Sequence, residues 1–127
     1  MIIKCITLHQ PWAWAIFHGK PVENRDWFCG YRGPLLIHAG KTFDDYGVKW
    51  IWDNRAELGI PWSAMPSVSD FPRGALIGKV DMIGCVRNHP SPWFFGPWGH
   101  VYANPEEFEK PIPAKGKQML WDWEWKK

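Results

Sequence analysis

The chain has 127 residues, of which 46% are hydrophobic and 22% are charged. This length suits one domain whose core can fold without disulfides or a structural metal, and no apolar run reaches the roughly eighteen residues of a membrane-spanning helix. The net charge of +2 is small for a protein that binds duplex nucleic acid through charge, so it favours a small anion or a short single strand as partner.

Cysteine and histidine usage indicates neither a disulfide framework nor a metal centre. The cysteines are Cys5, Cys29 and Cys85, an odd number without a CxxC pair, which is typical of reduced thiols in the cytoplasm. The five histidines are scattered, and none forms a close-spaced ligand pair. The start of the chain lacks the features of a signal peptide. We therefore expect a cytoplasmic, monomeric single domain over residues 1–127, without metal or cofactor.

The beginning of the chain predicts a strand followed by a short helix. Residues 1–8 carry β-branched residues at their start, which is typical of a strand. Pro11 suits the first position of a helix, in which Trp12 and Ile16 share one face at a spacing of four residues. Gly19 can adopt the positive φ of a helix terminus. The charged stretch that follows therefore begins where this helix ends.

A second strand and a longer helix are predicted next. Residues 34–40 form an apolar run after the turn-forming segment 29–34. Residues 43–58 show an apolar face at helical spacing and acidic residues in the first turn. Thr42 is the candidate N-cap of this helix, and Gly59 stands at its end.

The rest of the chain predicts loops and two strands. Residues 60–73 are rich in Pro, Ser and Asp and predict an ordered surface loop, whereas residues 90–99 hold too much proline for a helix or central strand. Residues 74–86 form the longest strand candidate, with two internal glycines that permit a bulge or bend. Residues 118–125 alternate, so that their three tryptophans face one side of a terminal strand. These elements predict an α+β, mainly β fold: a small mixed or antiparallel β-barrel with about two helices at its rim.

Charge gathers in the sequence HGKPVENRDW, directly after the first helix. If residues 22–27 are extended, Glu23 and Arg25 lie on the same side of a strand, with Lys20 near its root. A lysine beside a carboxylate in a partly closed site can act as base or cation, and an arginine can bind phosphate or a base edge. The alternative is a solvated turn whose surface ion pair contributes about 0 to 1 kcal/mol.

Asp81 stands inside an apolar run, where an ionised carboxylate needs a cation or hydrogen bonds. It shares a side of the predicted strand with Lys79, so that side is either the exposed face of an antiparallel sheet or an inward face. In the second case Asp81 would be the natural partner of Lys20.

Aromatic and basic residues add candidate contacts for a nucleotide. Trp12, Trp14 and Trp27 bracket the charged stretch, and flat rings beside basic groups hold single-stranded nucleic acid or flipped bases. Most of the eleven tryptophans must nonetheless belong to the core, so we assign only one or two to a ligand. Lys115 and Lys117 flank a glycine whose exposed backbone could help to hold phosphate, although the same sequence suits a solvated turn.

Several stretches together resemble the ASCH (activating signal cointegrator homology) domain family. They are CITLHQPWAWAIFHGKPVENRDW, GPLLIHAGK, RGALIGKVDMIGCV, YANPEEFEKPIPAKGK and the final aromatic strand. The resemblance covers nearly the whole chain except residues 60–73 and the proline-rich stretch before residue 99. It implies a PUA-like β-barrel with helices over a cleft.

The resemblance also implies contact with nucleotides. PUA-like relatives bind RNA or modified bases, and some small bacterial ASCH proteins deacylate N4-acetylcytidine with a lysine, a threonine and an acid from a later strand. By position the lysine falls on Lys20, the acid on Asp81 and the threonine on Glu23, which has no hydroxyl. The candidate catalytic residues are Lys20, Glu23 and Asp81, and the candidate nucleotide-binding residues are Trp12, Arg25, Trp27, Lys115 and Lys117.

Three functions follow as hypotheses. The first is a domain that binds RNA or a modified nucleoside in a nucleotide-sized cleft. The second is a metal-free amidohydrolase of N4-acylated cytidine, in which Glu23 acts as general base for a water and Lys20 stabilises the oxyanion. The third is a protein-interaction module of a regulatory complex that uses the exposed proline-aromatic loop at residues 90–99.

Overall fold

A computed structural model describes residues 1–125 of the chain. It contains six strands and two α-helices, and its mixed α+β, mainly β character confirms the predicted class. The elements in chain order are β1 (Ile2–Gln10), α1 (Trp12–Ile16), β2 (Val22–Arg25), β3 (Gly33–Phe43), α2 (Asp45–Leu58), β4 (Ala75–Val86), β5 (Trp98–Pro113) and β6 (Leu120–Glu124). Two short 3-10 turns, Trp62–Ala64 and Val68–Asp70, lie in the segment between α2 and β4. No helix in residues 1–125 is long and apolar enough to cross a membrane.

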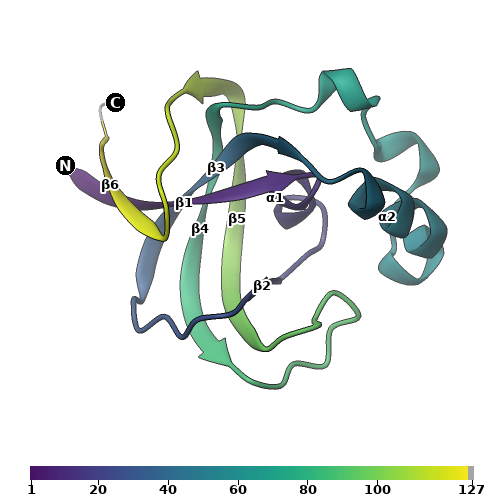
Figure 1. Cartoon of the computed structure of the whole chain (residues 1–127), viewed down its shortest axis with the longest axis horizontal. Coiled ribbons are helices and arrows are strands. Elements are labelled where there is room, and N and C mark those ends of the chain that lie inside the picture. The colour runs from purple at the N-terminus through teal and green to yellow at the C-terminus, as the bar shows by residue number, and fades with distance from the viewer. Residues whose placement is uncertain (126–127) are drawn as a thin grey trace.

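The strands form one curled sheet in the order β2-β5-β4-β3-β1-β6 (Figure 1). β1 and β3 run parallel, and the other neighbouring strands are antiparallel. The sheet is not closed into a barrel, since the order ends at β2 on one side and β6 on the other, so the barrel detail of the prediction is not confirmed. A side chain bridges part of the gap: Arg25 Nη2 on β2 donates to the carbonyl of Thr7 on β1 at 2.8 Å.

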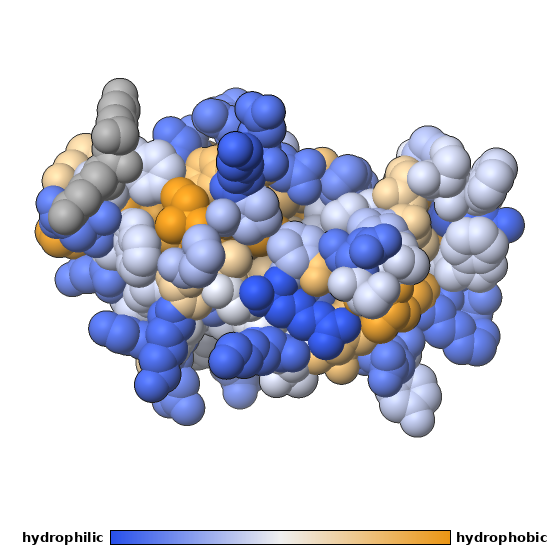
Figure 2. All heavy atoms as spheres, turned by 90° about the horizontal axis from the view of Figure 1, so that it is seen from above, coloured by the Kyte–Doolittle hydropathy of each residue, from blue (hydrophilic) through white to orange (hydrophobic). Residues whose placement is uncertain are grey.

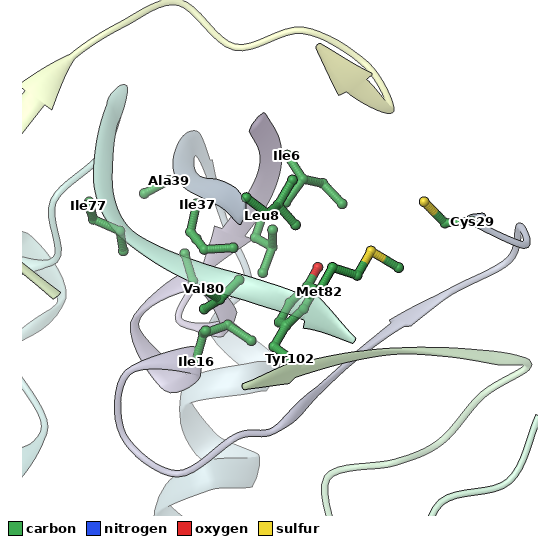
Figure 3. Packing of buried hydrophobic residues seen from close by; sticks show 12 residues of the cluster. Ile6, Leu8, Ile16, Cys29, Ile37, Ala39, Ile77, Val80, Met82 and Tyr102 are labelled. Carbon is green, nitrogen blue, oxygen red and sulfur yellow. The ribbon is translucent and has the colours of Figure 1, made fainter. Parts of the chain in front are cut away.

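The core fills the inside of this curl. Side chains from β1, β4 and β5 meet there, among them Leu8, Val80, Met82 and Tyr102, each no more than 5% exposed (Figure 3). They alternate with outward-facing neighbours because successive side chains of a strand point to opposite faces. A second buried cluster, which includes Ile51 of α2, joins both helices to the loops and so fixes α2 against the rest of the molecule.

The cap of α2 differs from the sequence prediction. Asp44, not Thr42, is the N-cap, because its side chain accepts the backbone N–H of Gly47 at 3.0 Å. The preceding residues still belong to β3, which ends at Phe43. The predicted terminus is confirmed, since Gly59 has the left-handed φ of 72°.

β5 is the longest strand, and the sequence analysis did not predict it. Pro105 and Pro111 make this segment look unlike a strand in the sequence, because proline has no N–H to donate to the neighbouring strand. The strand accommodates them because its pairing with β4 is irregular. The register between the two strands shifts at three places, and one of these shifts lies at Gly78 of β4 and another at Gly84. The predicted bulges at these two glycines are therefore present, and their partner is a strand that the sequence pattern concealed.

Candidate functional site

A cleft of about 350 Å³ opens between α1, β2, the start of α2 and the loop that precedes β5. We call it the aromatic cleft. Its lining residues are Trp12, Lys20, Glu23, Asn24, Asp44, Tyr46, Gly47, Trp50 and Phe95. Segments from four separate parts of the chain thus meet in one hollow, with rings on its walls and charges below them.

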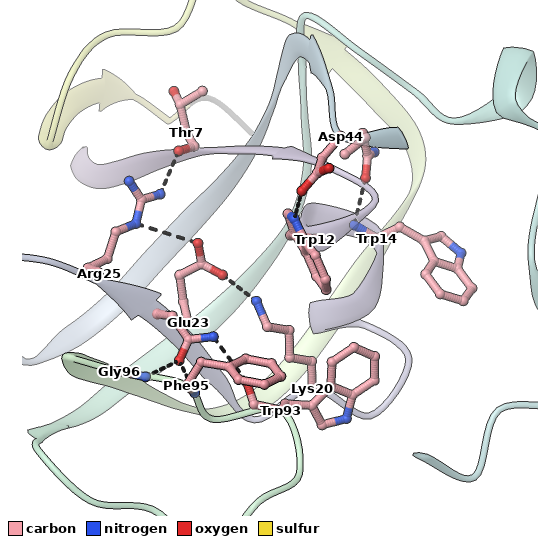
Figure 4. A network of polar contacts seen from close by, with 12 residues as sticks. Thr7, Trp12, Trp14, Lys20, Glu23, Arg25, Asp44, Trp93, Phe95 and Gly96 are labelled. Atoms are coloured by element: carbon pink, nitrogen blue, oxygen red, sulfur yellow. Dashed lines mark hydrogen bonds and ion pairs between the residues drawn. The ribbon is translucent and has the colours of Figure 1, made fainter. Parts of the chain in front are cut away.

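The charges at the bottom of the cleft form a buried ion pair. Lys20 Nζ lies 2.5 Å from Glu23 Oε1, and the two side chains are only 3% and 10% exposed (Figure 4). The end of α1 places the lysine, since the N–H of Lys20 donates to the carbonyl of Ala15. β2 places the glutamate by pairing with β5. The charged stretch is therefore not a solvated turn, because burial leaves each of the two charges dependent on the other.

Each residue of the ion pair has a second contact, and the two contacts differ in kind. On one side, Arg25 Nε lies 3.5 Å from the second oxygen of Glu23. On the other, the ammonium of Lys20 lies 5.1 Å from the ring centre of Trp12, within range of a cation–π interaction. Within residues 1–125 the ammonium of Lys20 makes one hydrogen bond, to Glu23, although an ammonium can donate three. It therefore keeps donor capacity for an acceptor in the cleft that it lines.

The Trp12 wall is held from α2. Asp44 Oδ2 accepts the indole Nε1–H of Trp12 at 3.0 Å, while Oδ1 caps the helix through the N–H of Gly47. Position 47 must be glycine, since a Cβ there would meet the Trp12 ring at 2.7 Å. One carboxylate thus fixes both the helix start and the ring that faces the ligand space.

The opposite wall is held by Asn24 of β2. Its Oδ1 accepts the backbone N–H groups of Phe95 and Gly96 at 2.8 and 3.1 Å, and its Nδ2 donates to the carbonyl of Trp93 at 3.0 Å. These bonds place the Phe95 ring 5.3 Å from that of Trp50, at an angle of 76°. A single side chain therefore ties the loop before β5 to the strand that carries the ion pair.

Buried polar groups without partners lie behind the pair. Within the described residues, Arg25 Nε, His100 Nδ1 and the Tyr102 hydroxyl have no hydrogen-bond partner. His100 Nε2 donates to the carbonyl of Trp27, and burial lowers the pKa of His100, so this ring is neutral with a bare Nδ1. Burial and the nearby carboxylate of Glu23 raise the pKa of Tyr102 well above its usual value. The surroundings of Glu23 on this side are thus polar, and the charges that act on His100 there include those of Arg25 and Arg32.

The structure brings together only part of the predicted site. Lys20, Glu23 and Trp12 line the aromatic cleft, and Arg25 lies beside it. Asp81 does not join them, and its expected place beside Lys20 was wrong: its carboxylate accepts an exposed hydrogen bond from Asn104 at 2.9 Å. The reason is strand alternation, because its neighbours on β4 point into the core and Asp81 therefore points away from it.

Three more predicted residues lie outside the aromatic cleft. Trp27 packs against the core, edge-on to His100 at 4.7 Å between ring centres. Lys115 and Lys117 line a separate groove near the end of β5. A direct role for these three in holding the same base is therefore not supported by their positions.

Sequence reasoning missed six of the nine residues that line the cleft: Asn24, Asp44, Tyr46, Gly47, Trp50 and Phe95. Trp50 was detectable in part, because two tryptophans two residues apart on one helix cannot share a face, so one must point away from the other. Asn24 and Phe95 gave no such signal, since their contact joins residues about seventy positions apart.

The lining suits binding more directly than covalent chemistry. None of the nine lining residues is a serine, threonine or cysteine, so the cleft supplies no aliphatic hydroxyl or thiol nucleophile. It supplies instead a donor and an acceptor at its base and rings on either side.

The sequence of the chain is similar to known proteins. The sequence profile of the ASCH domain matches residues 6–119 of the chain. The chain is also similar to activating signal cointegrator 1 of Homo sapiens and of Mus musculus, with 31% identity over 127 residues in each case. Each alignment covers 92% of this chain and 22% of the relative, so the chain spans about a fifth of the length of these curated relatives.

Proposed function

The chain belongs to the ASCH domain family, and from that premise we propose that it binds RNA or a modified nucleoside, with one base held in the aromatic cleft. The curled sheet takes the place of the PUA-like barrel that the resemblance implies, and the two helices flank the cleft at one end of it. The binding role and the base specificity are parts of one proposal, and the geometry of the cleft is its support.

The walls of the cleft suit a flat, apolar ligand. Trp50 stands between the rings of Trp12 and Phe95, with ring centres 6.1 and 5.3 Å away. The volume of about 350 Å³ lies in the range of small-molecule sites. Stacking of a base on an aromatic side chain contributes about 1 to 3 kcal/mol and does not depend on sequence.

The base of the cleft suits the polar edge of a nucleobase. Lys20 can donate to a ring nitrogen or carbonyl oxygen, while Glu23 can accept from an exocyclic amine or ring N–H. The buried ion pair lines the same cleft as four aromatic residues, and this single observation carries the proposal. If the pair served only the stability of the fold, two apolar residues in its place would often stabilise the protein equally well or better.

The test compares two tryptophans of α2. Trp50 lines the aromatic cleft, whereas Trp52 is 43% exposed, stacks on Arg55 and lies outside it. We expect Trp50→Leu to weaken binding of a labelled single-stranded RNA oligonucleotide about 5- to 150-fold in fluorescence anisotropy. Trp52→Leu should leave affinity unchanged. Equal effects of both variants, or no binding of oligonucleotide or nucleoside by the native chain, would contradict the proposal.

A second candidate function is favoured by the same ion pair. Glu23 could take a proton from a water that attacks the acyl carbon of N4-acetylcytidine, while Lys20 stabilises the oxyanion. The C–N bond then breaks, the proton passes from Glu23 to the leaving amine, and cytidine and acetate are released. Incubation with N4-acetylcytidine and chromatography for cytidine tests it. Absence of product, or full activity in Lys20→Met, would discard this candidate and leave binding alone.

A further inference from the structure

A second hollow of about 790 Å³ lies between the ends of β1 and β3 and the segment that follows β5. We call it the lysine groove. Its lining residues are Thr7, His9, His38, Gly40, Lys41, Thr42, Gly74, Ala114, Lys115, Gly116, Lys117 and Gln118. Three of the twelve are lysines and none is acidic, so its charge has one sign.

The charges of the groove are not neutralised by neighbours. Lys41, Lys115 and Lys117 are exposed. Among residues 1–125, no carboxylate lies within 4.0 Å of any of these three ammonium groups, whereas Lys4, Lys20 and Lys49 each have an acidic partner. Unpaired charges of one sign repel each other and so lower the stability of the folded chain. A group of such cations is typical of a surface that binds an anion.

The floor of the groove is held in one shape by a chain of hydrogen bonds. Trp121 Nε1 donates to Thr7 Oγ1, which lies 3.1 Å from His38 Nδ1, and His38 Nε2 donates to the carbonyl of Ala114 at 2.6 Å. Burial lowers the pKa of His38, so the ring stays neutral and Nδ1 accepts from the threonine hydroxyl. Gly116 then rests directly on this floor, since a Cβ there would meet Thr7 and His38 at 2.8 Å. The loop that carries two of the lysines is therefore positioned before any ligand arrives.

The lysine groove and the aromatic cleft are lined by successive parts of one segment. Thr42 lines the groove and Asp44, two residues later, lines the cleft. The ring of Phe43, the residue between them, packs against the buried cluster around Phe71. The guanidinium of the exposed Arg73 lies 4.5 Å from this ring centre and adds a cation beside the groove residue Gly74. The carboxylate of Asp44 is already engaged by an indole and a backbone donor. Seen from above, the end of the molecule where β5 finishes shows mostly hydrophilic side chains, with apolar ones between them (Figure 2).

We propose that the lysine groove binds backbone phosphates of the same single RNA strand whose base occupies the aromatic cleft. This inference rests on the proposed function. Lysine binds phosphate as a point charge, and three cations in a preformed groove suit consecutive phosphates of a flexible strand. The two hollows are lined by Thr42 and Asp44, only two residues apart along the chain, so one strand can reach both.

The test is the salt dependence of binding of a short single-stranded RNA to two triple variants of equal charge. K41Q/K115Q/K117Q removes the groove cations, and K49Q/K79Q/K110Q removes three lysines that line neither hollow. For single strands the slope of log K against log salt is about −0.7 per phosphate neutralised. We expect the groove variant to lower the magnitude of this slope by about 2 and to lose at least tenfold in affinity at low salt. The control should keep a slope close to that of the native chain.

Other measurements separate this inference from the proposed function. Trp50→Leu should weaken oligonucleotide binding without changing the salt slope, and free nucleoside should bind the groove variant as it binds the native chain. Equal slopes in both triple variants, with RNA still bound by the native chain, would overturn the groove proposal alone. Failure of the native chain to bind either oligonucleotide or nucleoside would overturn the proposed function. All six lysines are half-buried or exposed, so thermal melting by circular dichroism can verify that both variants fold.

Discussion

We can predict how much stability the protein loses when either residue of the Lys20–Glu23 ion pair is replaced. The two losses should differ, because the two residues have different second partners. In Glu23→Gln, both Lys20 and Arg25 face a neutral amide, and the lysine is only 3% exposed. In Lys20→Met, the carboxylate keeps Arg25 at 3.5 Å. Loss of the glutamate should therefore cost more stability than loss of the lysine.

The magnitudes follow from the burial of the pair. Removal of one partner of a buried pair costs about 3 to 5 kcal/mol, which we expect for Glu23→Gln. Lys20→Met leaves a charge that is still partly compensated, and we expect about 1 to 3 kcal/mol. The double variant should lose at least about 1 kcal/mol less than the sum of the single losses, because removal of either partner already abolishes the contact.

Urea unfolding followed by tryptophan fluorescence measures these differences. With a slope of about 2 kcal/mol per molar urea, a loss of 3 kcal/mol lowers the midpoint by about 1.5 M. The matched control is Lys49→Met, which breaks the exposed pair with Asp53 on α2 and should cost about 0.5 kcal/mol or less. Losses for Glu23→Gln as small as that of the control would refute the reasoning, since they would mean that the pair is solvated.

Further predictions concern residues around and away from the cleft. Asp44→Ala removes the cap of α2 and the acceptor of the Trp12 indole, so we expect a loss of about 2 kcal/mol in urea unfolding and weaker RNA binding. Asp81→Ala should change stability by about 0.5 kcal/mol or less and leave RNA affinity intact, because its hydrogen bond is exposed; a loss of binding would contradict its placement. Burial lowers the pKa of His38 from 6.5, so an NMR titration should show a midpoint below that value. Since the unfolded chain then takes up this proton first, the free energy of unfolding should fall as pH drops from about 6.5 through the lowered folded pKa. Burial raises the pKa of Cys5 to about 12, so alkylation with iodoacetamide at pH 8 should modify it only after unfolding, as mass spectrometry of peptides can show.

Local patterns in the sequence were enough for the elements whose residues follow one regular period. β1, α2 with its terminal Gly59, and the terminal strand with alternating tryptophans were all predicted, because each follows one period and ends at a clear signal. The charged stretch was also identified, since Lys20 and Glu23 are only three residues apart. Its burial was not evident, because burial depends on rings supplied by distant segments.

The remaining features depend on pairing across the chain. β5 carries three prolines within its sixteen residues, and only its register with β4 shows where bulges accommodate them. Asp81 could equally have faced either side of β4, and the choice was made by the neighbouring strands and not by its own surroundings in sequence. The sequence likewise predicted Lys115 and Lys117 as nucleotide contacts that help to hold a phosphate, but only the fold shows that they line a groove separate from the cleft.

The three hydrogen bonds of Asn24 join two parts of the cleft: the loop that supplies a ring and the strand that supplies the charges. The loop between β4 and β5 contributes one ring, Phe95, and this amide ties it to the strand that bears the charges. The loop could be lengthened, shortened or replaced while the amide still anchored whatever backbone took its place. A change in this loop would therefore alter the ring at Phe95, while β2 would still hold the carboxylate of the ion pair.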